Sequence, residues 1–351
     1  MTREMIDASA SSLASERLVM GESVFKFEEE FARYIGTDHA ISVSSGTDAL
    51  ILAMIALDLR NQDVVTTPFS FVATATSVVH AGAVPKFADI SAKDYNLDPS
   101  RLNGAGKSAA VLPVDLFGYP SRMDELREAA GDKVKIVEDA CQAHGAAVKG
   151  RKCGSMGDAG CFSFYPTKNM TVGGDGGMVT TNDERLAADV RKLRDCGRVS
   201  RYEHDVFGFT SRLNSANAAI GRIQLKHLDE WNERRRAIAK RYAEKLKDID
   251  GIVLPPMGSK DIVPVFHLFA IGCDDRDQLA SYLQSKGIDT AVHYPLPIHL
   301  QPVYRAKYGY KGGEFHISER ASKRMLSLPM FPEMTDTQVD FVSEQIVDYY
   351  A

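Results

Sequence analysis

A lysine that follows a nearly uncharged aromatic segment is the most reactive candidate in this sequence. Lys168 ends the stretch Cys161–Lys168, and a glycine cluster at residues 173–177 follows it. A strand in this stretch would carry Lys168 out of a buried sheet, into space that the glycines leave open. Burial disfavours the charged ammonium and lowers the pKa of a lysine, so the amine becomes a nucleophile. Most lysines are solvated surface residues, so Lys168 needs partners to carry a function.

An acid, a phosphate-binding turn and an aromatic segment accompany this lysine. Asp139 lies at the end of a predicted strand in the run Val137–His144, where a carboxylate can reach into a pocket. The turn Ser44–Asp48 leads into a helix, and backbone N–H groups at a helix N-terminus bind phosphate. The segment Pro68–Thr74 offers an aromatic face. Each feature alone is more often helix capping or core packing, but together they match pyridoxal phosphate (PLP), which needs a lysine and a carboxylate at its ring nitrogen.

The elements that must position these residues alternate between strand and helix from about residue 39 to residue 196. The expected strands are His39–Val43, Val64–Thr67, Pro85–Asp89, Ala109–Val114, Val134–Glu138, Gly160–Phe164 and Gly177–Thr181. The expected helices are Asp48–Leu57, Ala73–Ala81, Met123–Ala130 and Asp183–Arg194. Such alternation predicts an α/β layer on a largely parallel sheet, where ligands bind at the carboxyl ends of the strands.

The second half of the sequence begins with a long amphipathic helix that reaches Leu246. After Pro255 and Pro256 the pattern predicts a strand at Val263–Ile271, a helix at Arg276–Lys286, a proline-rich loop at His293–Pro302 and a last helix that opens with a capping box at Thr335–Gln338. We expect a boundary near residue 245, between a large domain at residues 1–245, with an N-terminal extension, and a small C-terminal domain at residues 246–351.

Composition excludes several classes of protein. The chain has 351 residues and a formal net charge of −5, which gives no basic footprint for nucleic acid. Its longest apolar run, Ala49–Leu57, is far shorter than the ~20 residues of a membrane-spanning helix. The five cysteines are scattered without a Cys-x-x-Cys motif, which favours neither a disulfide framework nor a structural zinc site. We expect a cytoplasmic protein with no bound metal, no membrane association and no nucleic-acid partner.

The sequence resembles the PLP-dependent sugar-nucleotide aminotransferases of the DegT/StrS family, which have fold type I of PLP enzymes. The motifs that carry the resemblance are Ser45–Leu50, Glu138–Ala140, Gln142–Ala146, Ser163–Asn169, Gly174–Gly177 and His293–Pro295, and the similarity extends from about Gly21 to the C-terminal helix. It implies a large α/β domain, with a mainly parallel seven-stranded sheet flanked by helices, and a smaller C-terminal α/β domain.

The resemblance also assigns roles to individual residues. Lys168 would attach the cofactor covalently, Asp139 would pair with the protonated ring nitrogen, and Gln142 would lie beside the ring hydroxyl. In the family an aromatic residue stacks on the cofactor ring, and the matching position here is Phe71. The positions that match the family's phosphate-binding residues are Gly46, Thr47 and Ser163. Candidate contacts to the sugar are His293, Tyr294 and His299.

A further family segment, Gly-x-Asn-x-Arg, reaches into the active site from the other subunit of a homodimer. Here it is Gly208–Arg212, in which Arg212 is kept but Thr210 replaces the asparagine. Thr210 retains one hydroxyl for the cofactor phosphate, but its reach is shorter, so this contact between subunits is an open question. Arg212 is also a candidate for the donor carboxylate or the sugar-nucleotide diphosphate, because arginine suits both.

The implied activity transfers an amino group from glutamate to a nucleotide-linked keto sugar, at C3 or C4 of a deoxyhexose, with pyridoxamine phosphate as the intermediate form of the cofactor. The motifs do not specify the sugar or the nucleotide. One alternative is a PLP-dependent sugar dehydratase; those members of the family replace the lysine with histidine, so Lys168 argues against it. Others are a PLP-binding regulator without turnover and a cysteine-dependent PLP lyase, for which no cysteine lies in a matching motif.

Overall fold

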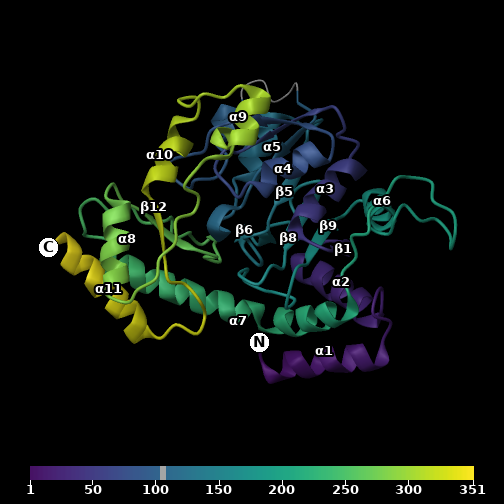
Figure 1. Ribbon diagram of the computed structural model, residues 1–351, viewed down its shortest axis with the longest axis horizontal. Coiled ribbons are helices and arrows are strands. Elements are labelled where there is room, and N and C mark those ends of the chain that lie inside the picture. Colours follow the sequence, from purple (N-terminus) through teal and green to yellow (C-terminus); the bar gives the residue numbers. More distant parts are fainter. Residues whose placement is uncertain (103–107) are drawn as a thin grey trace.

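The computed structural model describes residues 1–102 and 108–351, and a seven-stranded sheet lies at its centre (Figure 1). The strand order is β1-β9-β8-β5-β4-β2-β3. The strands are β1 (His39–Val43), β2 (Asp63–Thr66), β3 (Val84–Phe87), β4 (Ala110–Leu112), β5 (Lys135–Asp139), β8 (Ala159–Ser163) and β9 (Gly177–Thr181). Only β9 of this sheet runs against its neighbours. The predicted α/β fold with a mainly parallel sheet is therefore confirmed.

Helices cover both faces of this sheet. On one face, α3 (Gly46–Ala56), α4 (Ala73–His80) and α6 (Glu184–Arg194) bury their apolar side chains against the strands. On the other face, α2 (Glu22–Ile35), α5 (Met123–Ala130) and α7 (Ser215–Leu246) do the same. The alternation of side chains along a strand supplies both layers, as in β1, where Ile41 packs on the first face and Ala40 on the second. Predicted helices and observed helices agree to within two residues.

The N-terminal residues form α1 (Arg3–Ser15), which lies along α7 (Figure 1). Met5 joins Ile220 and Ile223 of α7 in a small apolar cluster, and a capping box at Thr2 fixes the start of α1. The sequence patterns predicted neither α1 nor α2 as helices. Within the described ranges, no helix is both long enough and apolar enough to span a bilayer.

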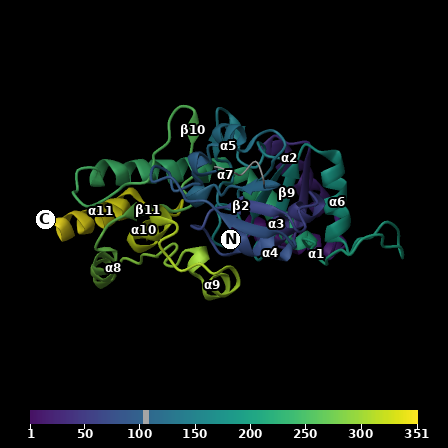
Figure 2. The same ribbon diagram turned by 90° about the horizontal axis from the view of Figure 1, so that it is seen from above.

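The C-terminal residues build a second core on the far end of α7. Ile238, Tyr242 and Leu246 of α7 pack against β11 (Phe269–Gly272), β12 (Met325–Leu328), α8 (Arg276–Ser285) and α11 (Asp336–Tyr350) (Figure 2). The predicted capping box at Thr335 opens α11. Because α7 contributes to both cores, it ties them together, and a domain boundary near residue 245 stays a prediction.

The segment predicted as one strand, Val263–Ile271, forms two. β10 (Ile262–Val263) pairs with β6 (Ala147–Val148), which also pairs with β7 (Arg151–Lys152), whereas β11 pairs with β12. Pro264 has no N–H to donate, and Phe266 adopts a positive φ of 44°, so the chain turns between the two strands. The remaining elements of the described ranges are the short helices η1 (Pro99–Arg101), η3 (Leu116–Gly118) and η4 (Ile298–Leu300), with α9 (Pro302–Tyr308) and α10 (His316–Arg324).

His144 is buried on the face of the sheet that α2 and α7 cover, and it makes the free energy of unfolding depend on pH. His144 packs against Phe162 and Phe164, and this burial, with a smaller contribution from the charge of Lys168, lowers its pKa from 6.5 to about 3. Between these values the unfolded chain binds the proton and the folded protein does not. The contribution of His144 to the free energy of unfolding is therefore constant above pH 6.5 and falls at lower pH. At pH 5 the free energy of unfolding is lower by about 2 kcal/mol.

Replacing His144 with phenylalanine is expected to remove this loss. Urea unfolding of the parent chain and of His144→Phe, at pH 7.5 and at pH 5, measures the loss of unfolding free energy in each protein. The variant should lose about 2 kcal/mol less between the two pH values than the parent chain. Equal losses in the two proteins would contradict the buried, neutral state of His144.

Candidate active site

The strands of the main sheet end at one cavity of about 570 Å³. Its volume falls in the range of pockets that hold a cofactor or a small substrate. The loops that follow β1, β2, β5 and β8 line it from the large sheet, and two segments of the C-terminal part close the other side. Of the predicted site residues, the cavity brings together Gly46, Thr47, Phe71, Asp139, Gln142, Ser163, Lys168, His293 and Tyr294.

Asp139 is a buried carboxylate at the end of β5. Its Oδ2 accepts a hydrogen bond from Thr74 Oγ1 at 2.8 Å, and its Oδ1 accepts one from the backbone N–H of Cys141 at 3.3 Å. Thr74 is held in turn by Ser70, at 3.0 Å between the two hydroxyl oxygens. Among the described residues, Asp139 has no ion pair with a lysine, arginine or histidine. The carboxylate is therefore fixed in orientation and faces a cavity in which a cationic partner would stabilise it.

Lys168 enters the same cavity from the turn after β8. Its backbone N–H donates to the carbonyl of Tyr165 at 2.9 Å, which closes the turn. The side chain is half-buried, and desolvation lowers the pKa of its amine, while the nearby groups Cys141 and Asp139 act in the opposite direction. A lowered pKa places more of the amine in its neutral, nucleophilic form near neutral pH.

The start of α3 forms the predicted phosphate cradle. Ser45 caps the helix by accepting a hydrogen bond from the backbone N–H of Asp48 at 3.0 Å, which leaves the first amides, of Gly46 and Thr47, at the cavity. A Cβ at Gly46 would come within 2.6 Å of the Ser163 Cβ and 2.9 Å of the Cys141 Sγ. Only glycine lets the helix end approach the other two loops so closely, and exposed amides there suit a phosphate.

Aromatic side chains also line the cavity or pack against its lining residues. Tyr294 lies near Phe71, with 6.4 Å between ring centroids, and stacks on Phe117 with an interplanar angle of 19°. Gln142 joins these groups, because its Oε1 accepts from the backbone N–H of Phe117 at 2.9 Å and its Nε2 donates to the Tyr294 hydroxyl at 3.2 Å. Phe71 itself is 56% exposed, so one face of its ring is open for stacking on a planar ligand.

The C-terminal part of the chain closes the cavity with four residues. His267 and Leu268 come from the turn before β11, while His293 and Tyr294 come from the proline-rich loop. His293 is oriented by Ser327 of β12, with 2.9 Å between its Nδ1 and the Ser327 hydroxyl. Both main bodies of the fold thus contribute to one site.

Three predicted residues lie outside this cavity. Arg212 forms an ion pair with Asp195 at 2.6 Å, and the exposed Thr210 is paired with Asp195 in an isolated β-bridge. The segment that joins α6 to these residues extends away from the body of the protein (Figures 1 and 2). His299 is fully buried, with its Nε2 3.0 Å from a carboxylate oxygen of Glu319. Glu319 and the neighbouring Glu314 accept hydrogen bonds from backbone amides of the loop at residues 311–315, so this acidic group braces a loop.

Cys141 lines the cavity beside Asp139 and bears on the lyase alternative. Burial raises the pKa of its thiol well above 9, and the charge of Asp139 raises it further. The nucleophilic form of cysteine is the thiolate, which this environment disfavours. Cys141 is therefore poorly suited to attack a substrate.

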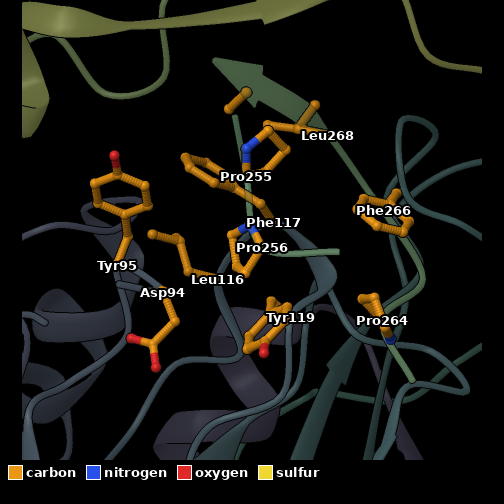
Figure 3. Close-up of a pocket in the computed structure, with 11 residues that line it drawn as sticks. Asp94, Tyr95, Leu116, Phe117, Tyr119, Pro255, Pro256, Pro264, Phe266 and Leu268 are labelled. Carbon is orange, nitrogen blue, oxygen red and sulfur yellow. The ribbon is translucent and has the colours of Figure 1, made fainter. Parts of the chain in front are cut away.

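A second, smaller hollow lies between the two parts of the chain and shares Leu268 with the main cavity (Figure 3). Its volume is about 20 Å³, enough for about one water molecule. The side chains around it are mostly apolar, including Leu116, Pro255 and Pro256. Its one carboxylate, Asp94, is paired with Arg122 at 3.2 Å. This hollow is a packing gap and offers no chemistry.

Sequence reasoning did not single out several residues of the cavity. Thr74 and Asp175 lie inside motifs that the sequence marked, so their position on a strand-to-helix junction and in a glycine cluster was the available signal. His267 was an isolated histidine in a predicted strand, and only the turn around Phe266 brings it to the cavity. No local pattern could have found it.

The fold and this cavity together define an α/β enzyme of the aminotransferase class. Residues 1–347 match the model of the DegT/DnrJ/EryC1/StrS aminotransferase family, so the chain belongs to that family. The resemblance read from the motifs is confirmed, and with it the enzyme class.

Curated relatives cover nearly the whole chain. A "dTDP-3-amino-3,4,6-trideoxy-alpha-D-glucose transaminase" of Streptomyces venezuelae is 42% identical, covering 94% of this chain and 88% of the relative. A "Pleiotropic regulatory protein" of Geobacillus stearothermophilus is 40% identical, covering 96% and 92%.

Solved structures agree with the fold throughout. S. venezuelae DesV in complex with a ketimine intermediate superposes with a TM-score of 0.95 at 40% identity, covering 99% of this chain and 94% of the other. Bacillus subtilis NtdA with bound cofactor PMP gives a TM-score of 0.91 at 30% identity, covering 99% and 82%.

Proposed function

We propose that this protein is a PLP-dependent transaminase that moves an amino group from glutamate to a nucleotide-linked keto sugar. The observation that carries the proposal is the meeting, in one cavity, of Lys168 and the buried Asp139, which has no ion pair among the described residues. A lysine of lowered pKa and a carboxylate without a cation are the two groups that PLP requires.

The residues present fit the cofactor. Lys168 would hold its aldehyde carbon, Asp139 its ring nitrogen, and the amides of Gly46 and Thr47, with Ser163, its phosphate. Phe71 would cover one face of the ring, and Gln142 would lie at the ring edge. The space that a Cβ at Gly46 would fill supports this fit. The NtdA structure, which holds the pyridoxamine form of the cofactor, supports the same cofactor here.

When bound, PLP supplies an electron sink that stabilises negative charge on the carbon that loses its proton. The residues of this chain supply the rest. The Asp139 carboxylate keeps the ring nitrogen protonated by its charge. The Lys168 amine, once free, moves a proton between the donor carbon and the cofactor carbon, first as base and then as acid. The two halves of the reaction share one site, so ping-pong kinetics are expected.

The names of relatives support the substrate class. The S. venezuelae relative is named for a thymidine-diphosphate amino sugar, and a protein 29% identical is described with a TDP-sugar product. The cavity keeps His293 and Tyr294 as candidate sugar contacts, whereas His299 is buried outside it. We also propose a cytoplasmic location, since five unpaired cysteines suit a reducing compartment.

The two half-reactions test this function directly. The protein loaded with PLP should show the absorbance of lysine-bound PLP, lose it when glutamate is added, and regain it when a keto-sugar nucleotide is supplied. A panel of nucleotides and keto sugars, assayed after glutamate, identifies the substrate and the carbon that is aminated. Loss of absorbance with glutamate but no recovery with any keto-sugar nucleotide would reject the substrate class and leave the cofactor assignment intact.

A homodimer with shared active sites is the further part of this proposal. The segment after α6 exposes apolar side chains that a second subunit would cover, namely Val199, Tyr202, Val206 and Phe207. Thr210 and Arg212 end this segment and lie outside the cavity of their own chain. Ser211, between them, donates to Asp48 at 2.7 Å and so anchors the segment on the cradle helix of its own chain.

Mixing two inactive variants tests this arrangement. Lys168→Ala and Arg212→Ala are each expected to be nearly inactive, and after subunit exchange about a quarter of wild-type activity should return. In a mixed dimer one site receives the intact lysine from one subunit and the intact arginine from the other. Asp195→Ala is the control, because it removes the ion pair of Arg212 but keeps the arginine. No recovery on mixing would place Arg212 outside the partner's site.

A PLP-binding regulator is the second candidate, favoured by the name of the G. stearothermophilus relative. Turnover separates the two functions. A chain that binds PLP at Lys168 but leaves the absorbance unchanged with every amino donor would support the regulator.

A further inference from the structure

We propose that His267 is a positioning residue for Lys168: two buried asparagine side chains fix its ring so that the unprotonated Nε2 is available to accept a hydrogen bond from the Lys168 amine once the cofactor releases that amine. The inference rests on the proposed function, in which that amine is freed from the cofactor and must be held in place to move a proton. His267 lines the cavity with Lys168, and its other ring nitrogen is bound to the residue next to Lys168.

The two asparagine side chains are anchored on backbone carbonyls. Asn232 of α7 donates its Nδ2 to the carbonyl of His144 at 2.8 Å. Asn169 donates its Nδ2 to the Asn232 Oδ1 at 2.9 Å and to the carbonyl of Val265 at 3.1 Å. The Oδ1 of Asn169 lies 3.2 Å from the Nδ1 of His267. Asn169 and Asn232 are at most 4% exposed, so water does not replace these bonds.

These anchors determine which nitrogen of His267 carries the proton. A carbonyl oxygen only accepts, so the Nδ2 groups of Asn232 and Asn169 must face the carbonyls of His144 and Val265. The Oδ1 of Asn169 is therefore the atom that faces His267, and an amide oxygen only accepts. The Nδ1 of His267 must be the donor, and in the neutral ring the lone pair is then on Nε2.

The surroundings keep this ring neutral. Burial lowers the pKa of His267 well below 6.5, and the positive charges of Lys168 and Arg235 lower it further, with smaller effects of His144 and His293. Arg235 is itself buried and donates to the carbonyls of Phe266 and His267 at 3.2 and 3.4 Å. The nearby charges of Arg235 and Lys168 both disfavour the imidazolium.

A neutral acceptor beside Lys168 has a defined use. Within the described residues, the His267 Nε2 has no protein partner, and the Lys168 amine has no acceptor. A free amine carries donors, so a hydrogen bond to Nε2 would point its own lone pair toward the reacting carbon. An acidic acceptor would instead hold the amine as ammonium, which cannot act as a base.

Replacing His267 with asparagine or with glutamine tests the roles of its two ring nitrogens separately. The amide of His267→Asn occupies the place of Nδ1, so it keeps the contact with Asn169 but loses the acceptor in the cavity. The amide of His267→Gln reaches the place of Nε2, so it restores an acceptor. We expect His267→Asn to take up PLP at Lys168 as the parent does, but to react with glutamate about 10-fold more slowly in a single turnover. His267→Gln should recover much of that rate.

The isotope effect provides a readout that a merely structural role would not change. With glutamate deuterated at Cα, the rate ratio should be larger for His267→Asn than for the parent, because proton transfer becomes slower than the other steps. An unchanged rate and isotope effect in His267→Asn would overturn the inference. Failure of the parent chain to attach PLP at Lys168 would instead overturn the proposed function, so the two failures are distinguishable.

A measurement without turnover tests the tautomer itself. In the cofactor-free protein labelled with ¹⁵N-histidine, the resonances lost in His267→Asn assign this ring. They should report a proton on Nδ1 and none on Nε2 from pH 6 to pH 9. A proton on Nε2, or a charged ring in this range, would overturn the inference whatever the rates of the two variants.

Discussion

Lys168→Ala is expected to abolish the absorbance of lysine-bound PLP and to lower the rate of transamination by about 10³-fold or more. The amine has two tasks: it holds the cofactor covalently, and it carries the proton between two carbons. Alanine does neither, and among the residues that the structure describes no other lysine lines the cavity. The rate of the glutamate half-reaction, followed by absorbance in a single turnover, measures the loss.

The matched control is a lysine on the surface. Lys240 of α7 is 76% exposed, so Lys240→Ala should keep both the absorbance and the rate. Added methylamine should restore part of the activity of Lys168→Ala, because a small amine can enter the space that the side chain leaves and move the proton. A Lys168→Ala protein that reacts with glutamate at the parent rate would refute the role of this residue.

Asp139→Asn is expected to lower the same rate by about 10²–10³-fold, the size of effect seen when one preorganised electrostatic group is removed from an active site. The amide has the size of the carboxylate and can still accept from Thr74. It carries no charge, so it cannot hold a proton on the ring nitrogen, and the electron sink is weakened. Single-turnover kinetics with glutamate and the absorbance of the bound cofactor measure this effect.

The variant Thr74→Val distinguishes the effect of the charge of Asp139 from the effect of its orientation. It removes the 2.8 Å hydrogen bond to Asp139 but leaves the carboxylate charged. We expect a loss of about 10-fold, clearly smaller than for Asp139→Asn. If Asp139→Asn retained the parent rate, or if Thr74→Val were the more damaged protein, the charge of Asp139 would not be the source of its effect.

Much of the fold and the centre of the site followed from the sequence. The strands His39–Val43 and Gly177–Thr181 were predicted at their observed bounds, because short β-branched runs between turn residues leave little freedom. Lys168 and Asp139 were found because each follows such a strand. In a parallel sheet the residues after different strands meet at one edge, so a linear order of motifs becomes one cavity.

The parts that the sequence did not reveal depend on contacts between distant segments. α1 and α2 were missed, and α1 is held by the contact of Met5 with α7, which no local pattern records. The break between β10 and β11 depends on Phe266, whose positive φ is set by its neighbours in space. His267 reaches the cavity only because of that break. Its tautomer follows from Asn169 and Asn232, which are 63 residues apart.

The most direct test of this account is the site of covalent attachment. The protein loaded with PLP is reduced with borohydride, digested and analysed by mass spectrometry. We predict one modified peptide, with the added mass on Lys168, and none in Lys168→Ala. Modification of a different lysine, or none in a protein that binds PLP, would contradict the assignment of the active site.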